Sequence, residues 1–293
     1  MNTAAQHFPA IAGPLPAHGD FEIEDEDFRF LVREVHRRTG IVISDRKRPM
    51  LCGRLSRRLR ALGLNSFHAY CEMLAGPHGP QEISAMVNAV TTNLTAFFRE
   101  PHHFEHLRQV ALPGIHKRGQ ETGERRIRLW SAGCSSGEEP YSLAMTLLNG
   151  TPSLAAWDAR ILATDLDTDM LQTAAAGLYK SSDAPLLSAQ NRVRFAEPSD
   201  DLDFITVGPA ARRLIIFKQL NLLDAWPMRG PFDIIFCRNV MIYFDEATKT
   251  KLVDRFADIL CPSGYLYIGH SETLFKITSR FEPAGQTVYR KVS

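Results

Sequence analysis

The stretch Leu129–Met145, LWSAGCSSGEEPYSLAM, decides the fold of this chain. A run of β-forming residues at 126–130 leads into a turn of small residues that contains Gly133 and Gly137, and a helical pattern begins at Pro140. Strand, glycine-containing turn and helix, in this order, are typical of an open α/β sheet in which a ligand approaches the backbone of the turn. We therefore expect an α/β domain with a ligand site at this turn.

Two carboxylates, Glu138 and Glu139, follow the turn and indicate which kind of ligand it binds. A phosphate-binding turn keeps carboxylates away from its anion, whereas this turn has two beside it. The favoured ligand is therefore cationic, or rich in hydroxyl and amino groups. S-adenosylmethionine, a nucleoside with a sulfonium and an ammonium group, fits that description. The dinucleotide fingerprint G-x-G-x-x-G is missing, which disfavours a nicotinamide cofactor.

Composition excludes several classes of protein. The chain has 293 residues, enough for one large or two modest domains, and 44% of them are hydrophobic. A net charge of +1 gives no overall attraction to nucleic acid or membranes. No apolar run approaches the roughly 20 residues of a membrane span, and the N-terminus lacks a secretory signal pattern. The five cysteines are widely spaced without a C-x-x-C pair, which favours reduced thiols and a cytoplasmic protein.

The distribution of residue types along the sequence predicts the domain organisation. Residues 1–20 are rich in Ala and Pro and are expected to form a disordered leader. Residues 21–114 read as helical, with apolar residues at helical spacing, and a polar stretch after Gly114 marks a boundary. From there to residue 293, short apolar strands alternate with helices, as in a parallel sheet. A segment at about 190–218 departs from this alternation and is interpreted as a small β insertion.

The second strand of the α/β part ends in ATDLD, and Asp165 is its terminal carboxylate. An acidic residue at this place can accept hydrogen bonds from both ribose hydroxyls of a nucleoside. The alternative is a helix N-cap, a role that Asp165, Asp167 and Thr168 could each fill. Together with the glycine-containing turn, the ribose role is favoured for Asp165.

The run TTNLTAFFREPHHF, residues 91–104, places Asn93, Thr95 and Arg99 among apolar neighbours. One interpretation is a helix end with Thr95 as N-cap and Arg99 on the surface. The other is a segment that lies over the cofactor, with Arg99 pointing at a carboxylate.

Three histidines follow Arg99, namely His102, His103 and His106. They lack the carboxylate–histidine spacing of a known metal-binding helix. We therefore expect a solvated helix face and no metal site.

The run FDIIFCRNVMIYFD, residues 232–245, predicts a buried strand that ends at Arg238 and Asn239, with Tyr243 shortly after it. Polar side chains at the carboxyl end of a parallel strand face the ligand crevice of such a sheet. Asn221 and Leu222 close the preceding strand and should border the same crevice.

Seven segments together carry a resemblance to a known family: NLTAFFRE, WSAGCSSGEEPYSLAM, ATDLDTDML, NLLD, FDIIFCRNVMIYFD, IGHSE and GQTVY. In this order and spacing they resemble CheR-type chemotaxis receptor methyltransferases, over about residues 22–290. The resemblance implies a class I S-adenosylmethionine-dependent methyltransferase sheet with a small β-subdomain, preceded by an all-helical N-terminal domain. It also implies methyl transfer from S-adenosylmethionine to glutamate side chains on the cytoplasmic helices of chemoreceptors, which forms glutamate methyl esters and S-adenosylhomocysteine.

The same resemblance assigns site residues. Arg99 and Tyr243 are expected near the methyl acceptor as the catalytic pair, and Glu139 is favoured over Glu138 at the cofactor. The residues expected to line the cofactor are Asn93, Thr95, Arg99, Glu139, Asp165, Asn221, Leu222, Arg238 and Asn239. We expect a monomer that binds no nucleic acid and does not insert into membranes. The alternative function is a catalytically silent S-adenosylmethionine-binding signalling module, and a nucleic-acid methyltransferase is a weaker third.

The basic stretch at 46–60 is predicted to be a helix with Leu51, Leu55 and Leu59 on one side and arginines on the other. Arg54, Arg57 and Arg58 form a candidate docking surface for receptor helices, which present several glutamates. A solvated surface explains such a run equally well.

Overall fold

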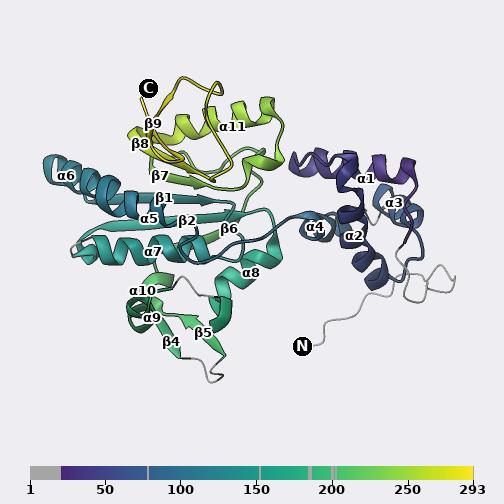
Figure 1. Cartoon of the computed structure of the whole chain (residues 1–293), viewed down its shortest axis with the longest axis horizontal. Helices are drawn as coiled ribbons and strands as arrows, with labels where there is room; N and C mark the ends of the chain where they lie inside the picture. Colours follow the sequence, from purple (N-terminus) through teal and green to yellow (C-terminus); the bar gives the residue numbers. More distant parts are fainter. Residues whose placement is uncertain are drawn as a thin grey trace. The chain divides into compact units, whose positions relative to one another are not determined.

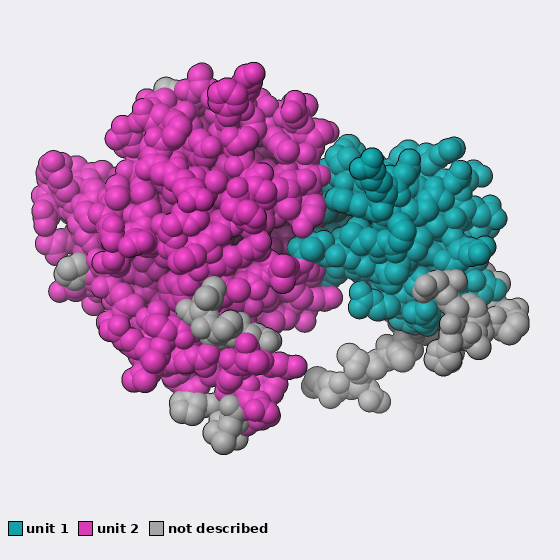
Figure 2. Space-filling view, in the orientation of Figure 1, with its two compact units in different colours: residues 1–92 teal, residues 93–293 magenta. Residues whose placement is uncertain are grey.

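The computed structural model describes residues 21–77, 79–151, 153–183, 187–198, 201 and 203–292. The predicted leader, residues 1–20, lies outside these described residues. The chain forms two compact units, residues 1–92 and 93–293, which Figure 2 shows in separate colours. Each unit is described by itself.

The first unit is helical, as the sequence predicts. Its helices are α1 (Asp25–Thr39), α2 (Arg48–Leu62), α3 (Phe67–Ala75) and α4 (Gly79–Val90). α1 has acidic residues in its first turn and basic residues in its last, which suits the helix dipole. The apolar faces of the helices meet in one core, in which Leu31, Leu51, Leu55 and Leu59 are fully buried. The unit is thus held together by amphipathic packing.

The second unit is built on a seven-stranded sheet (Figure 1). The strands lie in the order β6 (Ile215–Gln219), β2 (Asp158–Asp165), β1 (Arg126–Ala132), β7 (Phe232–Cys237), β8 (Leu260–Ile268), β10 (Val288–Lys291) and β9 (Phe281–Gly285). The first five are parallel, and β10 runs antiparallel to both β8 and β9. The connections change direction between β1 and β7, so a ligand crevice is expected at the carboxyl ends of these two strands.

Helices cover both faces of this sheet, and Figure 1 shows α7 and α11 on opposite sides. One face packs against α5 (Pro101–His106), the π-helical segment Leu107–Ala111, α6 (Leu112–Thr122) and α7 (Glu138–Gly150). The other packs against α11 (Glu246–Ile259). Adjacent residues of β1 enter different cores, Leu129 on the α7 side and Trp130 on the α11 side. Burial on both faces explains why these strands read as continuous apolar runs.

Two boundaries differ from the predicted ones. Residues 93–114, predicted to belong to the helical domain, are part of the second unit, because Phe104 and Leu112 are buried in the same core as β1. The small β-subdomain is a sheet of β3 (Leu178–Lys180), β5 (Phe204–Val207) and β4 (Ala196–Pro198), flanked by α9 (Ala189–Phe195) and α10 (Pro209–Arg212). It therefore begins before residue 190, and the predicted insertion wrongly includes β6, a strand of the main sheet.

No helix within the described ranges is both long enough and apolar enough to cross a membrane.

Candidate functional site

The glycine-containing turn lies at the carboxyl end of β1, as predicted. The backbone N–H of Cys134 donates to the carbonyl of Thr164 at 2.9 Å, which ties the turn to the end of β2. Gly137 has φ +100°, and a Cβ there would lie 2.8 Å from the Cβ of Ala174 in α8 (Thr168–Ala176). Glycine is therefore required at this position both for its backbone conformation and for its close packing.

Asp165 lies at the end of β2 and faces this turn. Its Oδ2 accepts the backbone N–H of Ser135 at 2.7 Å, and its Oδ1 accepts that of Asp167 at 2.9 Å. The N-cap of α8 is Asp167, which accepts the backbone N–H groups of Asp169 and Met170. The capping alternative for Asp165 is therefore excluded. Burial raises the pKa of Asp165 above its ordinary value.

The segment 93–100, here called the strap, lies over the same turn. The side chain of Asn93 donates to Oδ2 of Asp167 at 2.7 Å, and its carbonyl accepts the hydroxyl of Ser135 at 3.1 Å. Half-buried Thr95 lies in this strap, and it does not cap a helix because α5 begins later, at Pro101. The interpretation of Thr95 as an N-cap is therefore wrong.

Arg238, at the end of β7, is the centre of a buried charge network. Its Nη1 donates to Oε2 of Glu139 at 3.1 Å, and its Nη2 donates to the carbonyl of Arg99 and lies 3.4 Å from Oε2 of Glu100. Only 3% of the Arg238 side chain is exposed. The other oxygen of Glu139 accepts the hydroxyl of Ser131 at 2.7 Å. Burial raises the pKa of Glu139, while Arg238 acts in the opposite direction. The pair of Arg238 and Glu139 thus links the end of β7 to the first turn of α7.

Arg99 and Glu138 flank this network. Arg99 is half-buried, and its Nη1 donates to the carbonyl of Leu94 at 2.7 Å. A guanidinium has five N–H donors, so a single contact leaves most of them for a ligand. Glu138 is buried and accepts the hydroxyl of Ser136 at 2.7 Å.

Backbone strain gathers at this site. The described part of the chain has eight non-glycine residues with positive φ, and four of them lie in site segments: Phe98, Glu100, Ser135 and Asn239. A left-handed conformation at such residues costs energy and persists only where the surroundings enforce it. Its concentration in the strap, the turn and the end of β7 marks these three segments as functional.

The loop after β7 is organised by a residue that sequence reasoning missed. The carboxylate of Glu272 accepts the backbone N–H groups of Gly269, Asn239 at 3.0 Å and Ile242 at 3.1 Å. A Cβ on Gly269 would lie 2.3 Å from the side-chain nitrogen of Asn239, so the two strand ends approach closely. Half-buried Tyr243 ends the 3₁₀ turn Met241–Tyr243 of this loop. Glu272 is the last residue of the IGHSE segment, and that segment is the sequence signal from which its role could have been predicted.

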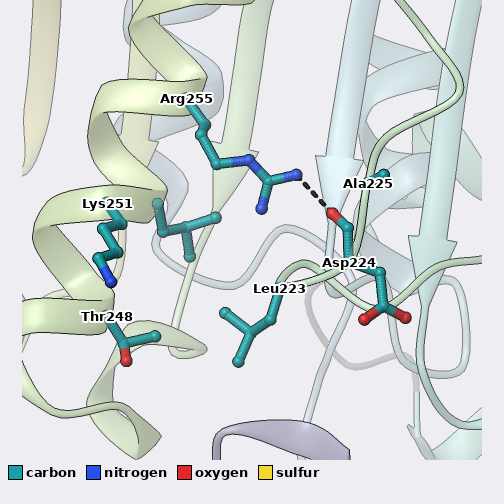
Figure 3. A pocket seen from close by; sticks show the side chains of 7 residues that line it. Leu223, Asp224, Ala225, Thr248, Lys251 and Arg255 are labelled. Atoms are coloured by element: carbon teal, nitrogen blue, oxygen red, sulfur yellow. Dashed lines mark hydrogen bonds between the residues drawn. The ribbon is translucent and has the colours of Figure 1, made fainter.

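The loop after β6 borders Asp165 as expected. The backbone N–H of Leu220 donates to the carbonyl of Asp165 at 2.9 Å, which brings Asn221 and buried Leu222 next to it. Arg255 of α11 donates to the carbonyls of Leu222, at 2.6 Å, and Asp224 (Figure 3). A cavity of about 480 Å³ opens beside this loop, and its lining comprises Leu223, Asp224, Ala225, Thr248, Lys251, Leu252 and Arg255.

The prediction of a solvated face for the three histidines is wrong. His103 is 0% exposed, and its Nε2 lies 2.9 Å from the hydroxyl of Thr287. Burial, followed by the charge of Arg238, lowers the pKa of His103 to about 3. Half-buried His106 pairs through Nδ1 with the hydroxyl of Tyr267 at 2.8 Å. Both side chains face the sheet, because α5 packs against it.

The three arginines predicted for substrate docking lie on α2 of the helical unit. Arg54 donates to the carbonyls at the end of α4, including that of Thr91 at 2.8 Å. Arg58 makes two hydrogen bonds, at 2.8 and 2.6 Å, with the buried carboxylate of Glu82. Arg57 is exposed. Two of the three therefore have structural roles that the solvated-surface interpretation does not include.

Comparison with known proteins identifies the family. The CheR methyltransferase all-alpha domain matches residues 26–91, and the CheR methyltransferase SAM binding domain matches residues 93–290. A probable chemotaxis protein methyltransferase of Rhizobium etli is 44% identical over 254 residues, which is 86% of this chain and 94% of the relative. The chemotaxis protein methyltransferase of Salmonella typhimurium is 42% identical over 272 residues, 91% of this chain and 90% of the relative. A solved phosphoethanolamine N-methyltransferase 1 of Haemonchus contortus matches 56% of this chain and 27% of its own, with 13% identity and a TM-score of 0.31.

These matches confirm the resemblance and the predicted fold class of an all-helical domain followed by a methyltransferase sheet. They also confirm that the cofactor is S-adenosylmethionine. The chain belongs to the CheR family of S-adenosylmethionine-dependent chemotaxis protein methyltransferases.

Proposed function

We propose that this protein transfers a methyl group from S-adenosylmethionine to glutamate side chains of chemoreceptors, forming glutamate methyl esters. The observation that carries the proposal is the set of carboxylates at the ends of β1 and β2, together with the guanidinium of half-buried Arg99, whose backbone carbonyl accepts from Arg238 at the end of β7. The carboxylates suit a cationic nucleoside, and the guanidinium suits a carboxylate acceptor.

The donor set fits the cofactor. In this proposal Asp165 accepts the ribose hydroxyls, while Asn221 and Leu222 lie beside it on the loop after β6. Asn93, Thr95, Glu139, Arg238 and Asn239 line the rest of the site. When bound, S-adenosylmethionine supplies a methyl group already activated by its sulfonium. Glu139 acts together with Arg238, because the two are paired before any ligand arrives.

The acceptor needs positioning and no general base. A glutamate side chain has an ordinary pKa of about 4.3 and is ionised at neutral pH. Holding such a weak nucleophile in line can supply up to about 7–11 kcal/mol of the barrier. Arg99 holds one carboxylate oxygen while the other attacks, and Tyr243 completes the orientation through its hydroxyl. The half-buried positions of both side chains support these roles.

A labelled-methyl assay tests the proposal. Purified protein, receptor-containing membranes and methyl-labelled S-adenosylmethionine should give label on the receptor that mild base releases as methanol. Arg99→Ala should abolish most of this label, and Arg99→Lys should restore part of it, because an ammonium can hold the same single carboxylate oxygen. Cofactor binding without label would indicate a silent binding module, and base-stable label in RNA would indicate a nucleic-acid methyltransferase.

A further inference from the structure

Three side chains that could ligate a metal converge at the start of α5, next to the proposed transfer site. Glu100, His102 and His103 each offer one ligand atom, and these atoms lie within 4.8 Å of one another. Glu100 has a left-handed backbone, with φ 58° and ψ 67°, and the rings of the two histidines are 4.2 Å apart. The strained backbone thus brings a carboxylate against two imidazoles.

The atoms that face one another in this cluster have no hydrogen-bond partner. Over the part of the chain that the structure describes, the buried unpaired side-chain atoms include Oε2 of Glu100, Nε2 of His102 and Nδ1 of His103. A buried polar atom without a partner costs about 1–3 kcal/mol. Oε2 of Glu100 has an ion-pair contact with Arg238 at 3.4 Å but no hydrogen bond. Three such atoms around one point indicate that a group outside the protein chain satisfies them.

The hydrogen bonds of His103 show which of its nitrogens carries the proton. The hydroxyl of Thr287 donates to the carbonyl of Gln286 at 2.8 Å, so it accepts from Nε2 of His103. In a neutral imidazole Nδ1 then has a bare lone pair. Nδ1 lies 3.4 Å from Oε2 of Glu100. A metal ion between the nitrogen and the carboxylate oxygen would satisfy both atoms.

We infer that Glu100, His102 and His103 form a binding site for a divalent transition metal, with Zn²⁺ as the best match. Two imidazoles and one carboxylate are a ligand set that zinc accepts, with a fourth position open. Zinc ligands at about 2.0–2.1 Å in a tetrahedron are separated by about 3.3–3.4 Å. The distance of 3.4 Å between Oε2 of Glu100 and Nδ1 of His103 matches this separation between ligands. The ligand atoms of the cluster lie within 4.8 Å of one another, so half-buried His102 needs only a small movement to complete the set.

The surroundings of the site also suit a metal. Thr287 fixes the ring of His103, as partners of the second nitrogen do in metal sites. The other oxygen of Glu100 accepts from His270 at 3.0 Å. Arg238 is the nearest competing cation, and its guanidinium is shared between the carboxylates of Glu100 and Glu139.

Metal titration of the full chain tests the site. The protein is prepared without a histidine tag, stripped with a chelator, and titrated with Zn²⁺ by calorimetry and with Co²⁺ by visible absorption. Wild type should bind one equivalent of Zn²⁺, and Co²⁺ should give the intense bands of a four-coordinate site. His102→Ala should weaken Zn²⁺ binding at least about 10-fold and abolish those bands.

His68→Ala is the matched control. His68 is 73% exposed in the helical unit and lies beside Asp27 and Glu72, so it removes a surface histidine–carboxylate group. This variant should bind Zn²⁺ as wild type does. Absence of Zn²⁺ binding in wild type, or equal binding by wild type and His102→Ala, would overturn the inference and leave a buried water as the missing partner. Loss of binding in His68→Ala would overturn it too, by assigning the ion to the helical unit.

Discussion

Glu272 provides the sharpest test of how the site is held together. Its carboxylate is 8% exposed and accepts the backbone N–H groups of Gly269, Asn239 and Ile242. We expect Glu272→Ala to release the loop between β7 and α11, which carries Tyr243. We expect Glu272→Gln to do so only in part, because one side-chain oxygen remains to accept hydrogen bonds.

The magnitude follows from these contacts. Each buried N–H left without an acceptor costs about 1–3 kcal/mol, and entering water recovers part of that cost. Three such groups give about 3–5 kcal/mol for Glu272→Ala, a large fraction of a typical unfolding free energy of about 5–15 kcal/mol. Glutamine loses one acceptor but also removes a buried charge, since burial raises the pKa of Glu272. About 1–2 kcal/mol is expected for Glu272→Gln.

Urea unfolding followed by tryptophan fluorescence measures this effect, with S-adenosylhomocysteine titrated by calorimetry into each folded variant. Stability and ligand affinity should both fall in the order wild type, Glu272→Gln, Glu272→Ala. Glu282→Ala is the control, because Glu282 forms an exposed ion pair with Arg290 in the same unit. That pair should contribute about 0–1 kcal/mol. A Glu272→Ala protein with wild-type stability and ligand affinity would refute the reasoning.

The remaining predictions concern three charged residues, Asp165, Arg57 and Arg58. Asp165→Asn should weaken cofactor binding by about 1.5–3 kcal/mol in calorimetry, and unchanged affinity in a folded variant would remove the ribose assignment. Because burial raises the pKa of Asp165 and the ribose hydroxyls need the ionised form, cofactor affinity should fall on acidification at a pH above the ordinary value of about 4. The contribution of Asp165 to folding stability has the opposite pH dependence. It is fully present below the pKa of the unfolded state and is lost as the pH rises through the pKa of the folded state. Asp165→Asn should flatten both the affinity and the stability profiles against pH. Arg57→Glu should raise the KM for receptors at low salt, while the urea concentration at the midpoint of unfolding stays as in wild type. Arg58→Ala should lower the unfolding free energy of the helical unit by about 2–3 kcal/mol, because the Arg58 side chain is only 29% exposed and its partner Glu82 is buried. Equal receptor KM values for wild type and Arg57→Glu would show that this helix face is a solvated surface and not a docking surface.

The parts of the site that the sequence predicts are those encoded over a few adjacent residues. The turn at Gly137 and the strand end at Asp165 follow from local patterns of small, apolar and acidic residues. The segment at Asn93 had two interpretations, and the hydrogen bonds from Asn93 to Asp167 and from Ser135 to Asn93 show that it lies over the turn. Its contact with the cofactor stays a prediction.

The parts that sequence reasoning missed depend on contacts between distant residues. Arg58 looks like a solvated charge until its partner on another helix, Glu82, is known. His103 looks like part of a polar helix face, yet its partner, Thr287, is 184 residues away. The polar residues after Gly114 suggested a linker because they form the outer side of α6, whose inner side, with Ile115, is buried.

The strand order has a consequence for how the protein forms during synthesis. β10 is the last strand in the described sequence, yet it lies between β8 and β9 in the sheet. While residues 288–291 are still being made, β8 has an open edge that can pair with other chains. The helical unit, complete by residue 92, has its own core and can fold long before that. A nascent chain therefore carries a finished helical unit ahead of a sheet that is completed only with residues 288–291.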